Sequence, residues 1–228
     1  MLFDSSWAGP LLWAAVYISD YRMTLTCARM YQAQQAIVFE GSYEITPLFQ
    51  ADVNALRRLS PRFVIALVAG TACLAVMQQT SSASGSSSLY AGALGALLLL
   101  QSAVHLRHFR NWFLFRNVRA LQGRVFYPRA LMLQASAIEL LGFAALYLTL
   151  FLLTSSVFIL GGDLACGALA FNHYRLVRRH LSMSIPEPGM SQLRRSSAIL
   201  LRSKKLLSSR FWNMVAAIER EANRCNTL

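Results

Sequence analysis

Apolar residues along this chain are concentrated in five long segments, which polar or charged stretches separate. A helix needs about 20 predominantly apolar residues to cross the hydrocarbon core of a bilayer, and each segment is close to that length. The segments cover about residues 9–31, 62–80, 89–109, 131–153 and 156–176. The pattern predicts an all-α fold, a polytopic membrane bundle of five transmembrane helices.

The connections between these segments differ in length and composition. Ser81–Ser88 is short, uncharged and rich in serine, and Thr154–Ser156 is the whole link between the fourth and fifth segments. Both predict tight turns that join neighbouring helices into hairpins. Residues 33–61 form a longer connector with Pro47 and the mixed run Leu48–Ser60. We expect a short helix there, either lying on the inner membrane surface or packed among the spans as a re-entrant element.

Composition supports a membrane protein, and charge placement predicts its orientation. Of the 228 residues, 55% are hydrophobic and 14% are charged, and the mean hydropathy is +0.41. The formal net charge is +12. The cations lie in the first segment and its following connector, around the link between the third and fourth segments, and after the fifth. Because loops rich in Lys and Arg stay in the cytoplasm, we expect the N-terminus outside and the C-terminus inside the inner (plasma) membrane.

The sequence divides into a membrane domain, residues 1–180, and a basic tail, residues 181–228. From Arg175 to the end, eleven cations outnumber three acids. Apolar residues recur beside these cations at spacings of three, four or seven, which predicts an amphipathic cytoplasmic helix. Such a helix would bind anionic lipid or pair with its own copies in a homo-oligomer. Base-reading motifs are missing, so nucleic acid is not an expected partner.

Two of the apolar segments carry polar residues on one helical face. In the first segment the shared face consists of Trp13, Tyr17, Asp20, Thr24, Cys27 and Tyr31. In the third it consists of Gln101, His105, His108 and Trp112. A charge inside a bilayer costs about 2.5–3.5 kcal/mol on insertion scales, so these faces should meet protein or water. Arg22 is two positions from Asp20, so it should point away from this face and belong to the inner-side cations.

Two further acids lie within the predicted spans, Glu139 in the fourth and Asp163 in the fifth. Counted along the helices, Asp20 and Glu139 fall in one middle-to-inner layer with His105 just below, whereas Asp163 is nearer the outside. Two carboxylates held close together out of water suit a proton relay or a cation site. The structural alternative is that the acids hydrogen-bond, or pair with Arg22 or Arg107, to hold the bundle together.

Other chemistry has weaker support in the sequence. His105 and His108 are three residues apart, and Glu139 or Asp20 would have to complete a metal site with them. One such pair with no second ligand motif does not define a metal site, and we predict no cofactor. A GxSxG motif and a glycine-rich phosphate loop are both missing, which argues against an enzyme.

A short pattern in the first fifth of the chain resembles that of a known family. Asp20-x-x-x-Thr24 is followed by Glu44-x-x-Pro47, similar to Asp-x-x-x-Thr and Glu-x-Asn-Pro in small bacterial polytopic membrane proteins of unknown function. Thr46 stands where that pattern has Asn, and the intervening loop is longer here. The resemblance implies a bacterial membrane bundle and importance for these four residues, and it supplies no reaction.

We expect an integral membrane channel or transporter for cations or protons, working as a homo-oligomer or within a larger complex. Its candidate polar residues are Asp20, Thr24, His105, Glu139 and Asp163. Arg22, Glu44 and Pro47 are candidates for structural or gating roles. The alternatives are a non-catalytic accessory or assembly subunit of a larger membrane complex, and a membrane enzyme that acts on a lipid or a quinone.

Overall fold

The computed structural model describes residues 7–85, 87–118 and 123–183 of the chain. The chain divides into two units, Met1–Leu181 and Ser182–Leu228, and the description below concerns the first. Most of the predicted basic amphipathic tail lies outside the described residues. The elements are α1 (Ala8–Gln32), β1 (Ile37–Phe39), α2 (Pro47–Asn54), α3 (Pro61–Ser84), α4 (Ser88–Asn117), β2 (Val125–Tyr127), α5 (Arg129–Thr154) and α6 (Val157–Met183).

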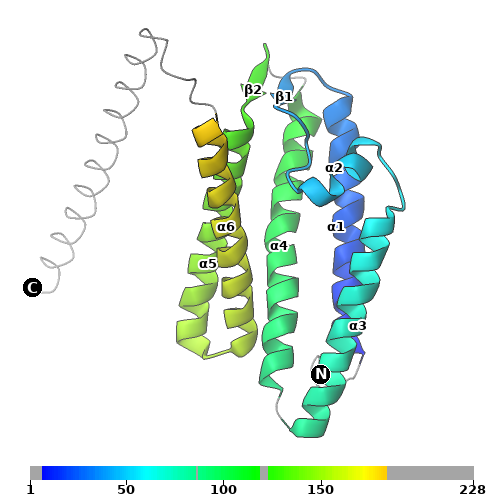
Figure 1. Cartoon of the computed structure of the whole chain (residues 1–228), viewed down its shortest axis with the longest axis vertical. Helices are drawn as coiled ribbons and strands as arrows, with labels where there is room; N and C mark the ends of the chain where they lie inside the picture. Colours follow the sequence, from blue (N-terminus) through cyan, green and yellow to red (C-terminus); the bar gives the residue numbers. More distant parts are fainter. Residues whose placement is uncertain (1–6, 86, 119–122, 184–228) are drawn as a thin grey trace, which may run out of the picture. The chain divides into compact units, whose positions relative to one another are not determined.

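Five long helices run side by side and alternate in direction along the chain (Figure 1). They coincide with the five predicted segments. α4 and α6 continue eight and seven residues past their predicted ends, and the other boundaries differ by one to four residues. Gly85 ends α3 in the left-handed conformation and Ser155 ends α5 in the same way. These caps close the two predicted hairpin turns at one end of the bundle. The connector, α2 and both strands lie at the other end (Figure 1).

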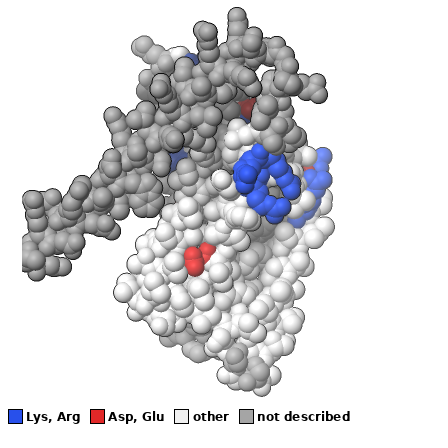
Figure 2. Space-filling model, turned by 60° about the vertical axis from the view of Figure 1, so that its left-hand side comes forward, with Lys and Arg blue, Asp and Glu red and all other residues white. Residues whose placement is uncertain are grey.

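Among the described residues, three helices are long and apolar enough to cross a membrane: α3, α4 and α5. Their outward side chains are apolar, as Ile65 on α3 is 68% exposed and Leu152 on α5 is 72% exposed. Soluble proteins rarely expose apolar areas of this extent, whereas lipid covers them at little cost. Figure 2 shows a largely uncharged surface with a group of Lys and Arg side chains toward one end. Such a surface suits contact with lipid, in keeping with three helices that are long and apolar enough to cross a membrane.

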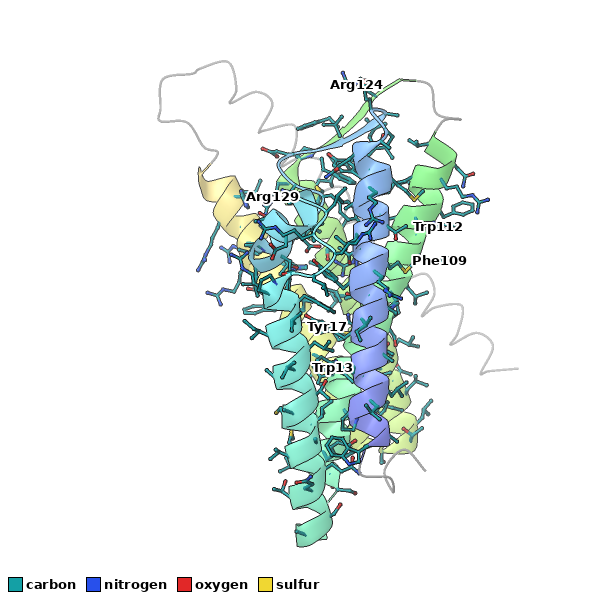
Figure 3. All side chains as sticks on the ribbon, turned by 90° about the vertical axis from the view of Figure 1, so that its right-hand side faces the viewer. Trp13, Tyr17, Phe109, Trp112, Arg124 and Arg129 are labelled. Atoms are coloured by element: carbon teal, nitrogen blue, oxygen red, sulfur yellow. The ribbon has the colours of Figure 1, made fainter. Side chains whose placement is uncertain are left out.

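Helix α4 is central to the bundle, because it packs on two sides. On one side Leu94 and Leu98 pack with Trp13 of α1 and Leu74 of α3. Tyr17 stacks on Trp13 and on Phe63, with ring centroids 5.0 and 5.1 Å apart, and Figure 3 shows Trp13 and Tyr17 between α1 and α3. On the other side, α4 shares an apolar cluster with α5 and α6, which is built from Ala103, Leu140, Ala144, Tyr147, Cys166 and Ala170.

The connector is folded against the helices. The short helix expected within residues 33–61 is present as α2, and Pro47 occupies its first turn, where no backbone donor is needed. Asp52 of α2 is buried, and its two carboxylate oxygens lie 3.0 Å from Arg57 Nη1 and 2.5 Å from Ser60 Oγ. Ser60 Oγ in turn accepts a hydrogen bond from the Phe63 amide at the start of α3. Phe49 of α2 packs against Tyr21 of α1 and Phe63 of α3, and the position of α2 relative to a membrane stays a prediction.

A pair of short strands was not predicted. β1 and β2 are parallel, with Ile37 opposite Val125 and Phe39 opposite Tyr127. Each strand has three residues, which is too short for an alternating pattern to stand out in the sequence. The pairing ties the connector after α1 to the segment that leads into α5.

Helices α4 and α6 approach each other at glycines. A Cβ atom added at Gly161 of α6 would overlap the carbonyl oxygen of Gly92 on α4, and one added at Gly95 would overlap the backbone of Phe158. Gly167, further along α6, has no heavy atom near its equivalent position. Backbone contact of this kind needs residues without side chains at the contact point.

We expect Gly161→Ala to destabilise the bundle by about 1–3 kcal/mol, because the backbone of α4 must move to admit the methyl group. The matched control is Gly167→Ala on the same helix, which should be neutral or slightly stabilising because alanine favours a helix. Thermal unfolding of the purified protein in detergent, followed by tryptophan fluorescence, measures both. Equal melting temperatures for the two variants would contradict the close approach.

Candidate functional site

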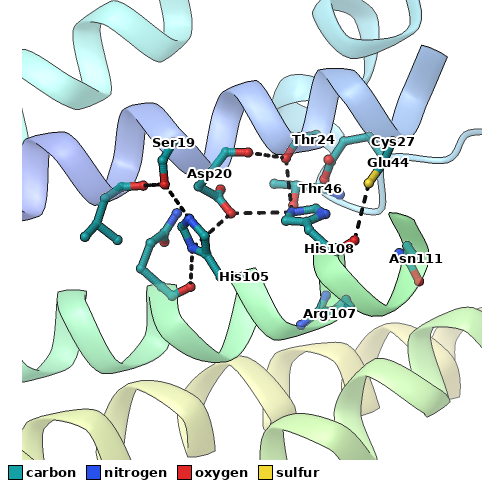
Figure 4. Close-up of polar contacts among 12 residues, drawn as sticks. Ser19, Asp20, Thr24, Cys27, Glu44, Thr46, His105, Arg107, His108 and Asn111 are labelled. Atoms are coloured by element: carbon teal, nitrogen blue, oxygen red, sulfur yellow. Dashed lines mark hydrogen bonds and ion pairs between the residues drawn. The ribbon is translucent and has the colours of Figure 1, made fainter. Parts of the chain in front are cut away.

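Asp20 of α1 is the centre of a polar cluster at the interface with α4. Its Oδ1 atom lies 3.7 Å from His105 Nδ1 and 3.5 Å from His108 Nε2 (Figure 4). The Asp20 side chain is 15% exposed. The two predicted polar faces therefore meet, one from α1 and one from α4. We call Asp20, His105, His108, Ser19 and Thr24 the polar centre.

Hydrogen bonds fix the orientation of the His105 ring. Its Nδ1 atom lies 2.8 Å from the carbonyl oxygen of Gln101, and a carbonyl can only accept, so Nδ1 carries a proton. In the neutral ring Nε2 is then an acceptor, so Ser19 Oγ, which lies 2.6 Å from Nε2 and 3.1 Å from the Val16 carbonyl oxygen, donates its one proton to the nearer atom, Nε2. Ser19 is exposed, so this side of the polar centre reaches the surface of the bundle.

The orientation of His108 follows from a different set of partners. Thr24 Oγ1 donates to the Asp20 carbonyl at 3.0 Å and lies 3.0 Å from His108 Nε2. Since the threonine proton is engaged, Nε2–H of His108 donates to Thr24 and faces Asp20. His108 Nδ1 is then an acceptor, 3.4 Å from the Tyr43 hydroxyl. Asn111 completes this side by donating to Tyr43 at 3.4 Å.

A cavity of about 230 Å³ adjoins the polar centre. Asp20, Thr24 and His108 line it on the α1 and α4 side, and His173 lines it on α6. The connector closes another side with its segment 43–46. The cavity thus joins a buried carboxylate to residues from four parts of the sequence.

Glu44 and Tyr43 bring two more titratable groups from the connector to this cavity. Glu44 Oε1 accepts a hydrogen bond from the Thr46 amide at 2.8 Å, which orders the turn before α2. Burial raises the pKa of the Glu44 carboxyl above its ordinary value. Burial also raises the pKa of the Tyr43 hydroxyl well above its ordinary value, so Tyr43 stays protonated and acts as a donor.

Glu139 does not join Asp20. Its carboxylate lies 3.2 Å from Arg107 Nε and 3.0 Å from Arg110 Nη1, and no hydrogen bond among the described residues joins it to Asp20. Asp20 and Glu139 thus contact neighbouring residues of α4, in keeping with one layer, but they pair with different partners and not with each other. The structural alternative describes Glu139 correctly, through its ion pair with Arg107.

The remaining sequence candidates are outside the polar centre. Asp163 is ten residues before His173 on α6, a rise of about 15 Å, and it lines neither this cavity nor the one beside Glu139. Arg22 is exposed and has no ion pair among residues 7–183 that are described, in keeping with its predicted separation from Asp20. Pro47 begins α2.

The metal candidates His105 and His108 are engaged in hydrogen bonds. Within the described part of the chain, no group of three or more His, Cys, Asp or Glu residues is arranged to hold a metal ion. Sequence reasoning missed Ser19, Tyr43 and Asn111 as members or neighbours of the site. Ser19 was missed because it is one position off the predicted face, and Tyr43 because it comes from a loop without periodicity.

No family model, no curated relative and no solved structure matches this chain. The resemblance over residues 20–47 therefore stands on its motif alone. Three of its residues, Asp20, Thr24 and Glu44, line the same cavity, although 20 or more residues separate Glu44 from the other two.

We expect the stability of the wild type to depend on pH through the Glu44 carboxyl, and Glu44→Gln to lack this contribution. A raised pKa in the folded state favours the protonated side chain, so its stabilising contribution is lost as pH rises through that value. The melting temperature of the wild type should therefore fall relative to that of Glu44→Gln as pH rises above the ordinary glutamate value.

Thermal unfolding across a pH series measures this difference. The comparison variant is Glu40→Gln, the same change in the same connector at an exposed carboxylate that accepts a hydrogen bond from the Arg129 amide; it should not reproduce the profile of Glu44→Gln. If the melting temperatures of the wild type and Glu44→Gln change with pH in the same way, the prediction that burial destabilises the charged form of Glu44 is wrong.

Proposed function

We propose that this protein is an integral membrane transporter or channel for protons, in which Asp20 and its two histidines form a relay. The observation that carries the proposal is the position of Asp20 Oδ1, within 4 Å of both His105 Nδ1 and His108 Nε2, at 3.7 and 3.5 Å. Acids and histidines inside a membrane are costly and usually mark ion or proton pathways.

We also propose that all five long helices cross the inner membrane, with the N-terminus outside and the tail in the cytoplasm. α1 accompanies α4 for much of its length, since Gly9 approaches Tyr90 near the start of α4 and Cys27 donates to the carbonyl of His108 further along. α6 accompanies α4 from Gly92 to the level of His108, where His173 lines the same cavity. Both helices thus occupy the same depth as α4, which itself is apolar enough to span.

The alternating helix directions support the same topology. The basic residues of the described chain fall in the second half of α1, in the connector, in the first turn of α3, in the second half of α4, around β2, and in the second half of α6. With helices that alternate in direction, all these places lie at one end of the bundle. An excess of Arg at one end is typical of the cytoplasmic side.

The relay would carry one proton at a time between the exposed and the enclosed sides of the polar centre. A proton taken up at His105 Nε2 makes that ring cationic, and its Nδ1 proton then passes to Asp20. His108 accepts the proton from Asp20 at Nε2 when its ring proton is on Nδ1, and the cationic ring then releases the Nδ1 proton toward Tyr43 and the cavity, which leaves the Nε2–H form described above. The 3.5 and 3.7 Å gaps are longer than hydrogen bonds, so each transfer needs a small side-chain movement or a bridging water.

A proton fits this centre better than a metal cation. Hard cations such as Ca²⁺ take six to eight oxygen ligands, and the polar centre offers a single carboxylate with two imidazoles. Thr24 and Gln101 hold the two rings in place and need not titrate. Glu139 and Asp163 have no part in this relay.

Proton flux into liposomes tests the proposal. The protein is reconstituted with a pH-sensitive dye inside, and a potassium diffusion potential drives proton entry. We expect the Asp20→Asn variant to lower the rate by about ten-fold or more, since a positioned proton-transfer group commonly contributes at least that much.

The matched control is Asp163→Asn, the same change at an acid outside the polar centre, which should keep the wild-type rate. Size-exclusion profiles establish that each variant is folded. A wild-type rate no greater than that of empty liposomes, or an unchanged rate for Asp20→Asn, would refute the relay.

A further inference from the structure

A second cavity lies on the other side of Arg107 from the polar centre. Its volume is about 400 Å³, and it is bounded by α4, by α5, and by residues of both strands and the connector. Its polar lining residues include Arg107, Arg110 and Asn111 of α4, and Ser136 and Glu139 of α5. This cavity plays no part in the proposed proton relay.

The charges around this cavity do not cancel. Glu139 is the one carboxylate among its lining residues, and it faces two guanidinium groups. Glu139 Oε2 is 3.2 Å from Arg107 Nε, and Glu139 Oε1 is 3.0 Å from Arg110 Nη1. The lining residues carry one more positive than negative charge, with the Arg107 side chain 13% exposed and the Arg110 side chain 58% exposed. Glu44 also faces Arg107, from the cavity beside the polar centre. Guanidinium groups at the wall of a cavity are suited to bind an anion.

Four buried polar atoms of the residues that line the cavity have no hydrogen-bond partner in the described part of the chain. Two of them, Arg107 Nε and Glu139 Oε2, face each other as an ion pair at 3.2 Å, and the other two are donors. Arg107 Nη2 and Ser136 Oγ have no hydrogen-bond partner among the described residues, although both residues line the cavity. Buried donors are nearly always satisfied in folded proteins, and exceptions call for an explanation. A ligand with several acceptor oxygens would satisfy both atoms at once.

The remaining wall of the cavity is apolar. Leu114 of α4 and Leu131, Met132 and Ala135 of α5 contribute to it, with aromatic rings from Phe39 and Tyr127. Such a wall beside a cationic end suits a ligand with an anionic head and an apolar body.

We propose that this cavity binds a phosphate-bearing ligand through Arg107, Arg110 and Ser136. A phosphate group offers three acceptor oxygens and matches the planar fork of a guanidinium, whereas a carboxylate offers two oxygens. Arg107 uses Nε toward Glu139 and has Nη2 left for the ligand. The apolar wall accommodates the glycerol and acyl part of a lipid, and a soluble phosphate would use the donors alone.

Calorimetric titration of the full-length protein in a non-ionic, phosphate-free detergent buffer tests this site. The probes are inorganic phosphate, glycerol phosphate, a short-chain phosphatidic acid and the corresponding neutral diacylglycerol. We expect phosphatidic acid to bind and diacylglycerol not to bind. Binding of inorganic phosphate with equal affinity would assign the site to a soluble phosphate.

Three variants connect the binding to the cavity. Arg107→Gln should weaken phosphate binding by about ten-fold or more, because a charge-assisted hydrogen bond is lost. Ser136→Ala should weaken it several-fold and should fold normally, since its hydroxyl has no partner to lose. Arg116→Gln removes an exposed charge from the same helix outside the cavity and should leave the affinity unchanged.

If Arg107→Gln does not fold, the phosphate affinity of Ser136→Ala alone tests whether the ligand binds in this cavity. Absence of binding for every phosphate probe would overturn the proposal, and so would an affinity that Ser136→Ala leaves unchanged. An equal loss in Arg116→Gln would show that surface charge alone attracts the ligand and would overturn it as well. None of these results depends on whether Asp20 carries protons.

Discussion

A carboxylate inside an apolar helix bundle needs polar or charged groups nearby, and Asp20 is such a carboxylate on α1. The helix has to turn its polar face toward α4, where His105 and His108 lie within 4 Å of Asp20 Oδ1, at 3.7 and 3.5 Å. The same rotation directs Trp13 and Cys27 into the apolar core and leaves Arg22 exposed. The packing of α1 and the composition of the polar centre are therefore two results of one requirement.

The connector completes the site, since two independent attachments hold it against the helices. Asp52 joins Arg57 and Ser60 at the start of α3, and β1 pairs with β2 before α5. Between these attachments, Tyr43 and Glu44 reach the cavity beside Asp20. Arg107 lies at the boundary, because it lines this cavity and the second one as well. A chain with few charged residues thus gathers much of its buried polar chemistry around α4.

The helices and their polar faces could be predicted from the sequence, whereas most contacts of the connector could not. Spacings of three and four marked the faces of α1 and α4 correctly, because helical geometry fixes which side chains share a face. Pro47 indicated α2 for a similarly local reason. Depth along a helix left two roles open for Glu139, and the structure has the ion pair with Arg107. Depth could not decide between them, because it says nothing about which side of a neighbouring helix a residue meets. The strands and Tyr43 escaped notice because a loop has no period from which its contacts can be inferred.

Nitrogen-15 NMR of labelled histidine measures the central claim, the shared contact of Asp20 with His105 and His108. Resonances of the protein in detergent are assigned with His105→Gln and His108→Gln. The account predicts that Asp20→Asn changes the nitrogen-15 chemical shifts of the His105 and His108 rings, whereas Asp163→Asn leaves both sets of shifts unchanged. If Asp20→Asn leaves both rings unchanged, the carboxylate does not lie between them, and the polar centre described here does not exist.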